Sequence, residues 1–165
     1  MKKGIIKNYI MPGLELLLDC VPADTWAAID SERARAMLLA IGLQESRFEC
    51  RKQIGGPARG FWQFERAGIR GVLTHPATKS IIADVCCELA VPADEEICHG
   101  LVAYHDVLAC CFARLLLWTL PRSLPAEDAT AEAWWQYIEA WRPGKPRNQT
   151  WDKFYAEAWA TVKQK

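Results

Sequence analysis

The sequence has no excess of charge of either sign, because 20 lysine and arginine residues balance 20 aspartate and glutamate residues. Without a basic field, nucleic acid is not the expected partner, since binding the phosphate backbone takes clustered positive charge. The sequence also lacks an uninterrupted apolar run of about 18 residues, so it predicts no membrane span. Both absences favour an ordinary globular protein.

The sequence also predicts no secretion signal, although its first residues resemble the start of one. The segment MKKGIIKNYIMPGLELLL opens with two lysines, but Lys7, Asn8 and Pro12 interrupt its apolar part. No small-residue cleavage site follows. We therefore expect synthesis in a cytoplasm without a signal peptide.

None of the seven cysteines forms the C-x-x-C pair that is typical of zinc sites. Their number is odd, and two adjacent pairs, Cys86-Cys87 and Cys110-Cys111, cannot easily close disulfides within themselves. Free, mostly buried thiols in a reducing compartment fit best, with no metal and no cofactor. Two alternatives stay open here, a metal site and a catalytic thiol. The first would use Cys86, Cys87, Cys98 and His99, and the second would pair Cys110 with His105.

Apolar residues in helical patterns fill most of the sequence. They make up 51% of the 165 positions, enough to bury a core in one domain. We expect a mainly α protein with a single domain over residues 1–165 and an irregular or β-hairpin region near residues 47–75, where glycine and proline gather. The eight tryptophans either fill the core or line a groove for ring ligands. Helices are expected over residues 12–20, 23–29, 31–46, 79–89, 92–120, 127–141 and from 150 onward.

The segment 92–120 predicts a buried central helix. Pro92 and the acidic residues 94–96 are typical of a helix start, because acid is favourable at the positive end of the helix dipole. A nearly all-apolar stretch then continues to Leu120, and a helix that is apolar all round is expected in the core.

One carboxylate lies on the apolar face of the helix predicted over residues 31–46. Ala34, Met37, Leu38 and Ile41 follow the i, i+3, i+4, i+7 pattern. In an α-helix, Glu45 lies about 20° from Ala34 around the axis. Burial disfavours the charged form of a carboxyl group and raises its pKa, as a general acid near neutral pH requires. The alternative is a buried ion pair between Glu45 and an arginine, with Arg47, Arg51 and Arg59 as candidates.

A glycine-rich loop follows Glu45 and suits the floor of a binding site. Gly55, Gly56 and Gly60 let the backbone approach a ligand. Gln63 offers a donor and an acceptor to hydroxyl or amide groups. Flat apolar surface is expected from Phe61, Trp62 and Phe64.

Two blocks in this stretch resemble the catalytic signature of soluble lytic transglycosylases and related lysozyme-like proteins. The first, Glu45-Ser46-Arg47-Phe48, stands where the family has E-S-x-F/W at a helix end. The second, GPARGFWQ over residues 56–63, stands where the family has G-A-x-G-L-M-Q. The interval of 18 residues from Glu45 to Gln63 is similar to the family's. Phe61-Trp62 replaces the usual Leu-Met, and Pro57 changes the spacing of the small residues.

The resemblance implies a lysozyme-like single domain and a peptidoglycan-degrading enzyme. Glu45 would be the catalytic acid for the β-1,4 bond between N-acetylmuramic acid (MurNAc) and N-acetylglucosamine (GlcNAc). Ala103-Tyr104-His105 is similar to the start of the family's A-Y-N-A-G segment, whose tyrosine approaches the glutamate, but the Asn-Ala-Gly is absent. The substrate-binding residues that the resemblance implies are Ser46, Gly60, Phe61, Trp62, Gln63 and Tyr104.

The reaction depends on whether a second carboxylate assists. A lysozyme-type hydrolase uses one as nucleophile or base, and Glu65 is the nearest candidate. The resemblance implies that a lytic transglycosylase needs Glu45 alone, which then also takes a proton from the sugar's 6-hydroxyl. We favour the transglycosylase and keep the hydrolase as an alternative. An alternative of another class is a non-catalytic glycan-binding or structural virion protein.

The expected partners are peptidoglycan glycan strands and, for a bacteriophage protein, other virion proteins. Without a signal peptide, an enzyme made in the host cytoplasm reaches the periplasm or cell wall at lysis, as an endolysin, or inside a virion. Trp141 to Pro146 (WRPGKP) resembles a segment of phage lysozyme-like proteins. This segment either binds anionic glycan or peptide stems or is a solvated turn.

Overall fold

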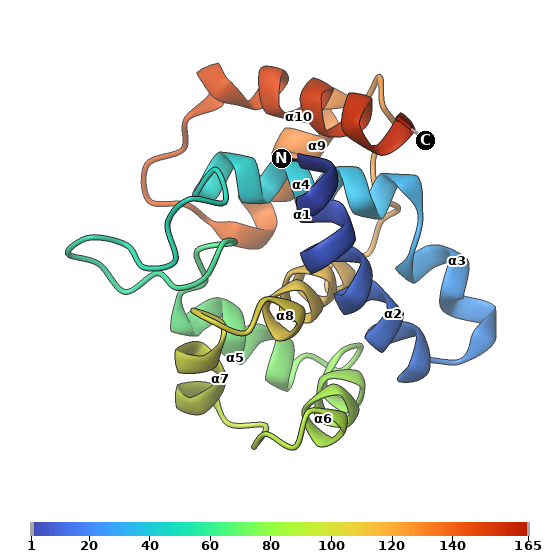
Figure 1. Ribbon diagram of the computed structural model, residues 1–165, viewed down its shortest axis with the longest axis vertical. Helices are drawn as coiled ribbons and strands as arrows, with labels where there is room; N and C mark the ends of the chain where they lie inside the picture. Colours follow the sequence, from blue (N-terminus) through green and yellow to red (C-terminus); the bar gives the residue numbers. More distant parts are fainter. Residues whose placement is uncertain (1, 165) are drawn as a thin grey trace.

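The computed structural model describes residues 2–164, which fold into helices joined by loops (Figure 1). This range contains no strand, and the mainly α class is confirmed. The α-helices are α1 (Lys2–Ile5), α2 (Met11–Asp19), α3 (Trp26–Ile29), α4 (Glu32–Glu45), α5 (Arg66–Thr74), α6 (Lys79–Glu88), α7 (Glu95–Leu101), α8 (Asp106–Trp118), α9 (Thr130–Trp141) and α10 (Asn148–Lys163). A π-helical stretch, Ile6–Ile10, joins α1 to α2, and a 3₁₀ turn, Ala23–Thr25, precedes α3.

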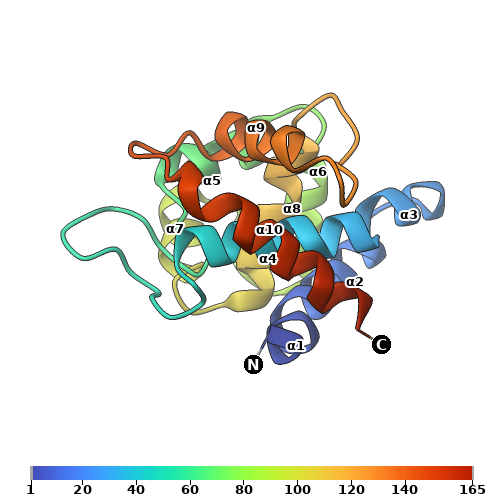
Figure 2. The ribbon, with the colours of Figure 1, turned by 90° about the horizontal axis from the view of Figure 1, so that it is seen from above.

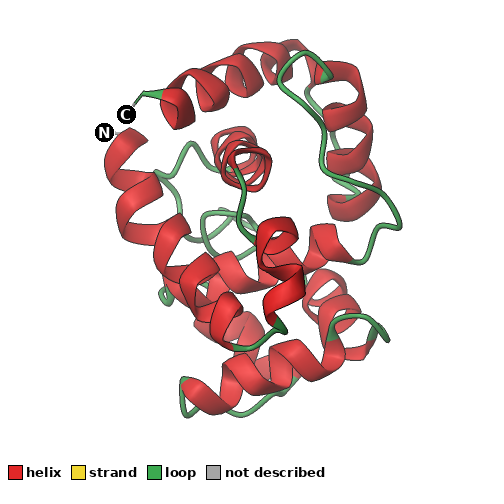
Figure 3. Cartoon of the chain, turned by 90° about the vertical axis from the view of Figure 1, so that its right-hand side faces the viewer, coloured by secondary structure: helices red, strands yellow, loops and turns green. Residues whose placement is uncertain are grey.

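Helix α4 lies at the centre of the fold. The Ser31 hydroxyl begins it by accepting a hydrogen bond from the Ala34 amide at 3.2 Å. All residues from Ala36 to Gln44 are buried. Figure 3 shows one helix end-on in the middle of the others, and its height in Figure 1 identifies it as α4. Helix α10 packs on α4: it runs above α4 in Figure 1 and crosses it obliquely in the view from above in Figure 2.

The N-terminal segment is helical from Lys2, which the sequence analysis did not predict. Pro12, where the sequence predicted a helix start, instead lies in the first turn of α2, directly after the π-helical stretch Ile6–Ile10. Ile5, Ile10, Leu14 and Leu17 are buried on its inner side. The segment is therefore part of the core.

The prediction of one helix over residues 92–120 is wrong, because the chain bends by 119° between α7 and α8. The His105 Nδ1 atom accepts a hydrogen bond from the Leu108 amide at 3.2 Å and begins a new helix there. Asp106, its first residue, accepts from Arg51 at 2.6 Å. Within residues 92–120 the buried helix is α8, in which every residue from Leu108 to Leu117 is buried.

The irregular region is shorter than expected. It ends at Glu65, because residues 66–74 form α5 with Ile69 and Val72 buried on one face. Only two isolated antiparallel bridges form in the described residues, Lys52 with Arg59 and Arg59 with Phe64. They fold residues 47–65 into a compact loop.

In the part of the chain that is described, no single helix is long and apolar enough to cross a membrane. Helices α7 and α8 reach that length and composition only together, across their bend. All seven cysteines are free, and four of them, Cys86, Cys98, Cys110 and Cys111, are buried.

Both cysteine alternatives lack support in the structure. Burial raises the pKa of the Cys110 thiol, whose Sγ contacts the Ile10 carbonyl oxygen at 3.4 Å, so this thiol is held neutral. Its proposed partner His105 serves as the cap of α8. Between residues 2 and 164, no group of three or more His, Cys, Asp or Glu side chains is arranged to hold a metal ion.

Candidate active site

Glu45 is the last residue of α4 and is partly buried. Its Oε1 accepts a hydrogen bond of 2.6 Å from the Tyr137 hydroxyl of α9. The carboxylate thus lies where the end of the central helix meets α9, with part of its surface still open. A carboxyl group in this position is desolvated enough for its pKa to rise and exposed enough to reach a substrate.

The environment of Glu45 raises its pKa to about 7. Burial is the main cause, since removing water disfavours the charged carboxylate, and the negative charge of Glu65 adds a smaller increase. The hydrogen bond from Tyr137 and the positive charge of Arg147 act in the opposite direction. Glu45 is therefore protonated in a large fraction of molecules at neutral pH.

The alternative ion pair between Glu45 and a buried arginine is not formed. Arg51 instead makes a two-pronged pair with Asp106 at 2.6 and 2.9 Å. Arg59 donates to the carbonyl oxygens of Gly56 and Ala58. Arg47 is exposed and makes no salt bridge within the described residues. Glu45 is thus a desolvated acid without a contacting counterion.

Tyr137 was not predicted, and α10 holds it in place. Its ring stacks on Trp151 with centroids 5.1 Å apart and an interplanar angle of 12°. Burial and the Glu45 carboxylate both raise the pKa of Tyr137, so the phenol stays a donor. Trp134, Tyr137 and Trp141 form an apolar stripe at helical spacing. A buried tyrosine hydroxyl in such a stripe needs a polar partner. This need was the feature of the sequence that could have indicated a contact between Tyr137 and a buried polar group.

The loop after Glu45 is fastened to the helix end by Ser46. The Ser46 hydroxyl donates to the Phe61 carbonyl oxygen at 2.6 Å and accepts from the Phe48 amide at 3.1 Å. These internal bonds occupy the side chain that was predicted to bind substrate. Ser46 therefore sets the distance between Glu45 and the segment that ends in Gln63.

Gly60 is required by close packing. Its φ is +74°, and a Cβ atom there would lie 2.2 Å from the Val102 carbonyl oxygen. Gln63 is partly buried, and its Nε2 donates to the Gly60 carbonyl oxygen at 2.8 Å. Gly60 thus packs the loop against the turn between α7 and α8, and its carbonyl oxygen orients the Gln63 side chain.

Phe61 and Trp62 correct the prediction of a sugar-stacking surface. Trp62 is fully buried and its Nε1 donates to the Leu38 carbonyl oxygen at 2.9 Å. Phe61 is only 5% exposed and packs against Phe48 and Tyr9. Both rings fill the core beneath α4 because the helix end leaves an apolar surface there, and neither offers a face to a ligand.

Tyr104 is 66% exposed and makes no hydrogen bond to Glu45 in the described residues. The Lys52 amino group lies 5.1 Å from its ring centroid. Tyr104 lines a hollow between the π-helical stretch and the turn before α8, together with Asn8, Tyr9 and His105. Its role in glycan binding stays a prediction.

Glu65 is exposed and precedes α5 without capping it. Its charge reaches Glu45, because it contributes to the raised pKa of that group. Its side chain makes no hydrogen bond or ion pair with the other described residues, so it is free to turn toward a substrate or water.

Five non-glycine residues in the described range have positive φ. Arg47 and Phe48 follow Glu45 directly in sequence, Gln63 ends the loop that Ser46 fastens to α4, and Arg142 ends α9, which carries Tyr137. The fifth is Ala90. Such conformations persist only where surrounding contacts enforce them, and they cluster at functional sites.

Comparison of the chain with protein-family models, with characterised proteins and with solved structures finds no match in any of the three.

Proposed function

We propose that this protein cleaves the β-1,4 bond between MurNAc and GlcNAc of bacterial peptidoglycan, with Glu45 as general acid and base. The observation that carries the proposal is the state of Glu45: partly buried, bonded to Tyr137, without a contacting counterion, and with a pKa near 7. A carboxyl group in this state can donate a proton to a glycosidic oxygen and take one back. The two sequence blocks that resemble lytic transglycosylases support the same assignment, and a lysozyme-like arrangement of the mainly α fold is part of the proposal.

The favoured reaction is that of a lytic transglycosylase. Protonated Glu45 donates to the glycosidic oxygen, and the bond from the anomeric carbon to that oxygen breaks. The acetamido oxygen of MurNAc bonds to the anomeric carbon in the meantime. Glu45, now a carboxylate, takes the proton of the 6-hydroxyl, whose oxygen displaces the acetamido oxygen and closes a 1,6-anhydro ring. Tyr137 supports this cycle because its hydrogen bond stabilises the carboxylate after each donation.

A lysozyme-type hydrolase is the second candidate, and Glu65 favours it. A second carboxylate near the acid can act as a nucleophile or activate water. Glu65 is exposed and close enough to influence the pKa of Glu45. The transglycosylase stays favoured because Glu65 has no contact that fixes it toward the reacting bond.

The proposed setting is a bacteriophage, with the enzyme made in the host cytoplasm and acting in the periplasm or cell wall. Release at lysis, or carriage in a virion with other phage proteins, brings it to glycan strands. Free thiols, among them the exposed Cys50 and Cys87, agree with synthesis under reducing conditions.

A zymogram on peptidoglycan tests the proposal. We expect clearing by the wild type and by the control Glu88→Gln, and none by Glu45→Gln. Equal clearing by wild type and Glu45→Gln would overturn the role of Glu45, and binding without clearing would indicate a glycan-binding protein. Mass analysis of the products then separates 1,6-anhydro ends, made by a transglycosylase, from reducing ends, made by a hydrolase.

A further inference from the structure

The loop over residues 142–147 is anchored at both ends beside Glu45, and we name it the cationic arch. At one end, the Trp141 Nε1 donates to the Trp62 carbonyl oxygen at 2.8 Å, directly before Gln63. At the other end, the Arg147 carbonyl oxygen accepts from the buried Gln44 Nε2 at 2.9 Å. The arch therefore spans from the Gln63 segment to the residue before Glu45 (Figure 1).

A third contact fixes the far end of the arch. Thr150, where the last helix was predicted to begin, donates from its hydroxyl to the Gln44 Oε1 at 2.9 Å. Helix α10 begins two residues earlier, at Asn148. Gln44 thus uses its whole side-chain amide to hold this end, which explains a buried polar residue next to the proposed catalytic acid.

The backbone of the arch is stiff. Arg142 ends α9 in the left-handed conformation, with φ 48° and ψ 51°. Pro143 and Pro146 fix their own φ angles and restrict the residues before them. Side chains on the arch are therefore presented in a defined place, as a preorganised binding surface requires.

The arch exposes positive charge that the protein does not neutralise. Arg142, Lys145 and Arg147 are exposed, and none forms a salt bridge within the described residues. Some basic residues elsewhere are paired, as Arg35 is with Asp30, and the unpaired ones, such as Lys3 and Lys79, lie far apart in the sequence. In a chain of zero net charge, three unpaired cations on one short loop are a local excess. The charge of Arg147 reaches the site, since it lowers the pKa of Glu45.

We infer that the cationic arch binds the carboxylates of the peptide stems carried by the glycan strand. This inference rests on the proposed function, because it concerns the substrate of the same site. The sugar units at the scissile bond are otherwise uncharged, so stem carboxylates are the anions that arrive next to Glu45. Charge-assisted hydrogen bonds from guanidinium and ammonium groups suit carboxylates. The arch makes the protein selective for stem-bearing over stripped glycan.

The test compares two substrates and two double variants. The substrates are peptidoglycan free of teichoic acid, with its stems intact, and the same strands after an amidase has removed the stems and the lactyl carboxylates that this exposes have been converted to methylamides. Arg142→Gln/Lys145→Gln removes two charges from the arch and leaves Arg147 in place. Lys3→Gln/Lys79→Gln removes two exposed charges from α1 and α6. Initial rates give the preference, the ratio of kcat/KM on stem-bearing strands to that on stripped strands.

We expect the wild type and Lys3→Gln/Lys79→Gln to share a preference for stem-bearing strands. In Arg142→Gln/Lys145→Gln the preference falls on the order of fivefold to tenfold, mostly through KM, as expected for two exposed charge pairs. High salt lowers the preference of the wild type in the same way. Methyl esterification of the stems abolishes it, which identifies the carboxylate as the ligand.

Three results would overturn the inference, and each differs from a failure of the proposed function. Equal wild-type rates on the two substrates, an unchanged preference in the arch variant, or an undiminished preference for esterified stems would each do so while cleavage persists. A preference that appears only on walls bearing teichoic acid would assign the arch to phosphate instead. If the wild type cleaves neither substrate, the proposed function itself has failed.

Discussion

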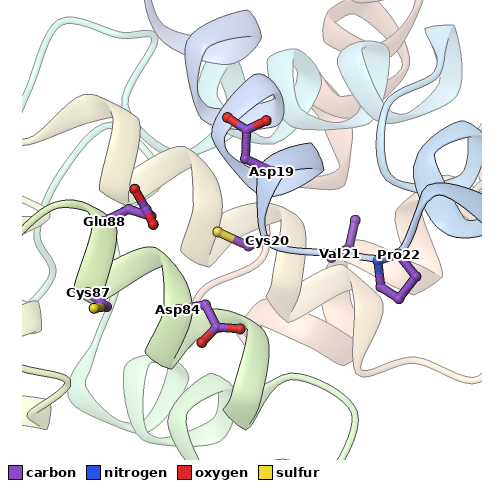
Figure 4. A pocket seen from close by; sticks show the side chains of 7 residues that line it. All are labelled: Asp19, Cys20, Val21, Pro22, Asp84, Cys87 and Glu88. Carbon is purple, nitrogen blue, oxygen red and sulfur yellow. The ribbon is translucent and has the colours of Figure 1, made fainter.

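Two glutamates of this protein each end a helix, Glu45 on α4 and Glu88 on α6, and their surroundings are opposite. Both glutamates lie at the C-terminal, negative end of a helix dipole, which disfavours a negative charge, so the dipole does not distinguish them. Glu45 is partly buried beneath α9 and α10 and bonded to one tyrosine. Glu88 is exposed at a hollow where Asp19, Asp84 and Cys20 also lie (Figure 4).

The hollow around Glu88 contains more carboxylates than the surroundings of Glu45, but it is a poorer place for a general acid. Its carboxylates are exposed, so water solvates each of them, and their combined charge acts on the thiol instead. Burial, followed by the charges of Asp84, Glu88 and Asp19, raises the pKa of Cys20. At Glu45 a single acid is placed where water is scarce. A perturbed carboxyl group thus depends on desolvation more than on the number of acids nearby.

The largest effect is expected when the two glutamates are replaced in turn. Glu45→Gln should lower kcat on peptidoglycan on the order of a hundredfold to ten-thousandfold, because proton transfer is lost. Glu88→Gln should keep wild-type kinetics. Initial rates of muropeptide release measure both. A loss of tenfold or less in Glu45→Gln would mean that another group supplies the proton.

Glu45→Gln, which should lose activity, should be more stable than the wild type at high pH, whereas Glu88→Gln should not. Because the folded pKa of Glu45 is raised, the folded state holds its proton more tightly, and stability falls as pH rises from about 4.5 to about 7. Glu45→Gln removes this penalty. Its free energy of unfolding should exceed that of the wild type by about 1 to 3 kcal/mol at pH 8, with allowance for partial exposure, and match it near pH 4.

Urea denaturation at the two pH values measures this difference. Glu88→Gln should change stability little at either pH, as surface substitutions do. If Glu45→Gln were less stable than the wild type at pH 8, the carboxylate would be a structural ion-pair member and not a strained acid.

Glu45 could be predicted from the sequence, and its partner Tyr137 could not. Glu45 was found because helical phase is local information, carried by Ala34, Met37, Leu38 and Ile41 within one helix. Tyr137 was missed because it lies 92 residues away, and no local pattern joins α9 to α4. The pairing is decided by the packing of α10 against α4, with Trp151 holding the tyrosine ring.

Two other errors have the same origin. The bend between α7 and α8 is fixed by tertiary contacts, from Gly60 to Val102 and from Arg51 to Asp106, so helical pattern alone carried the predicted helix through it. The aromatic pair Phe61 and Trp62 was predicted at a ligand surface because it adjoins the matched glutamine. Their burial depends on the underside of α4, which the sequence does not place.

A smaller effect is expected from Tyr137→Phe. The tyrosine bond stabilises the carboxylate and lowers the pKa of Glu45, so its loss should raise that pKa further. Activity that needs protonated Glu45 should then persist to higher pH, with the basic limb of the kcat/KM profile displaced upward by about one pH unit or less. The control Tyr155→Phe also loses hydrogen bonds, to Pro125 and Ala126. It should leave the limb in place even where stability falls.

The smallest effect is expected from Arg147→Gln. The positive charge of Arg147 lowers the pKa of Glu45 from an exposed position, so its removal should move the basic limb upward by less than Tyr137→Phe does. Salt separates this charge effect from a disturbed loop. Because the screening length falls from about 10 Å at 0.1 M to about 3 Å at 1 M salt, the limb of the wild type should approach that of Arg147→Gln as salt rises. A displacement that persists unchanged at 1 M salt would instead mean that Arg147 acts through its contacts with Gln44.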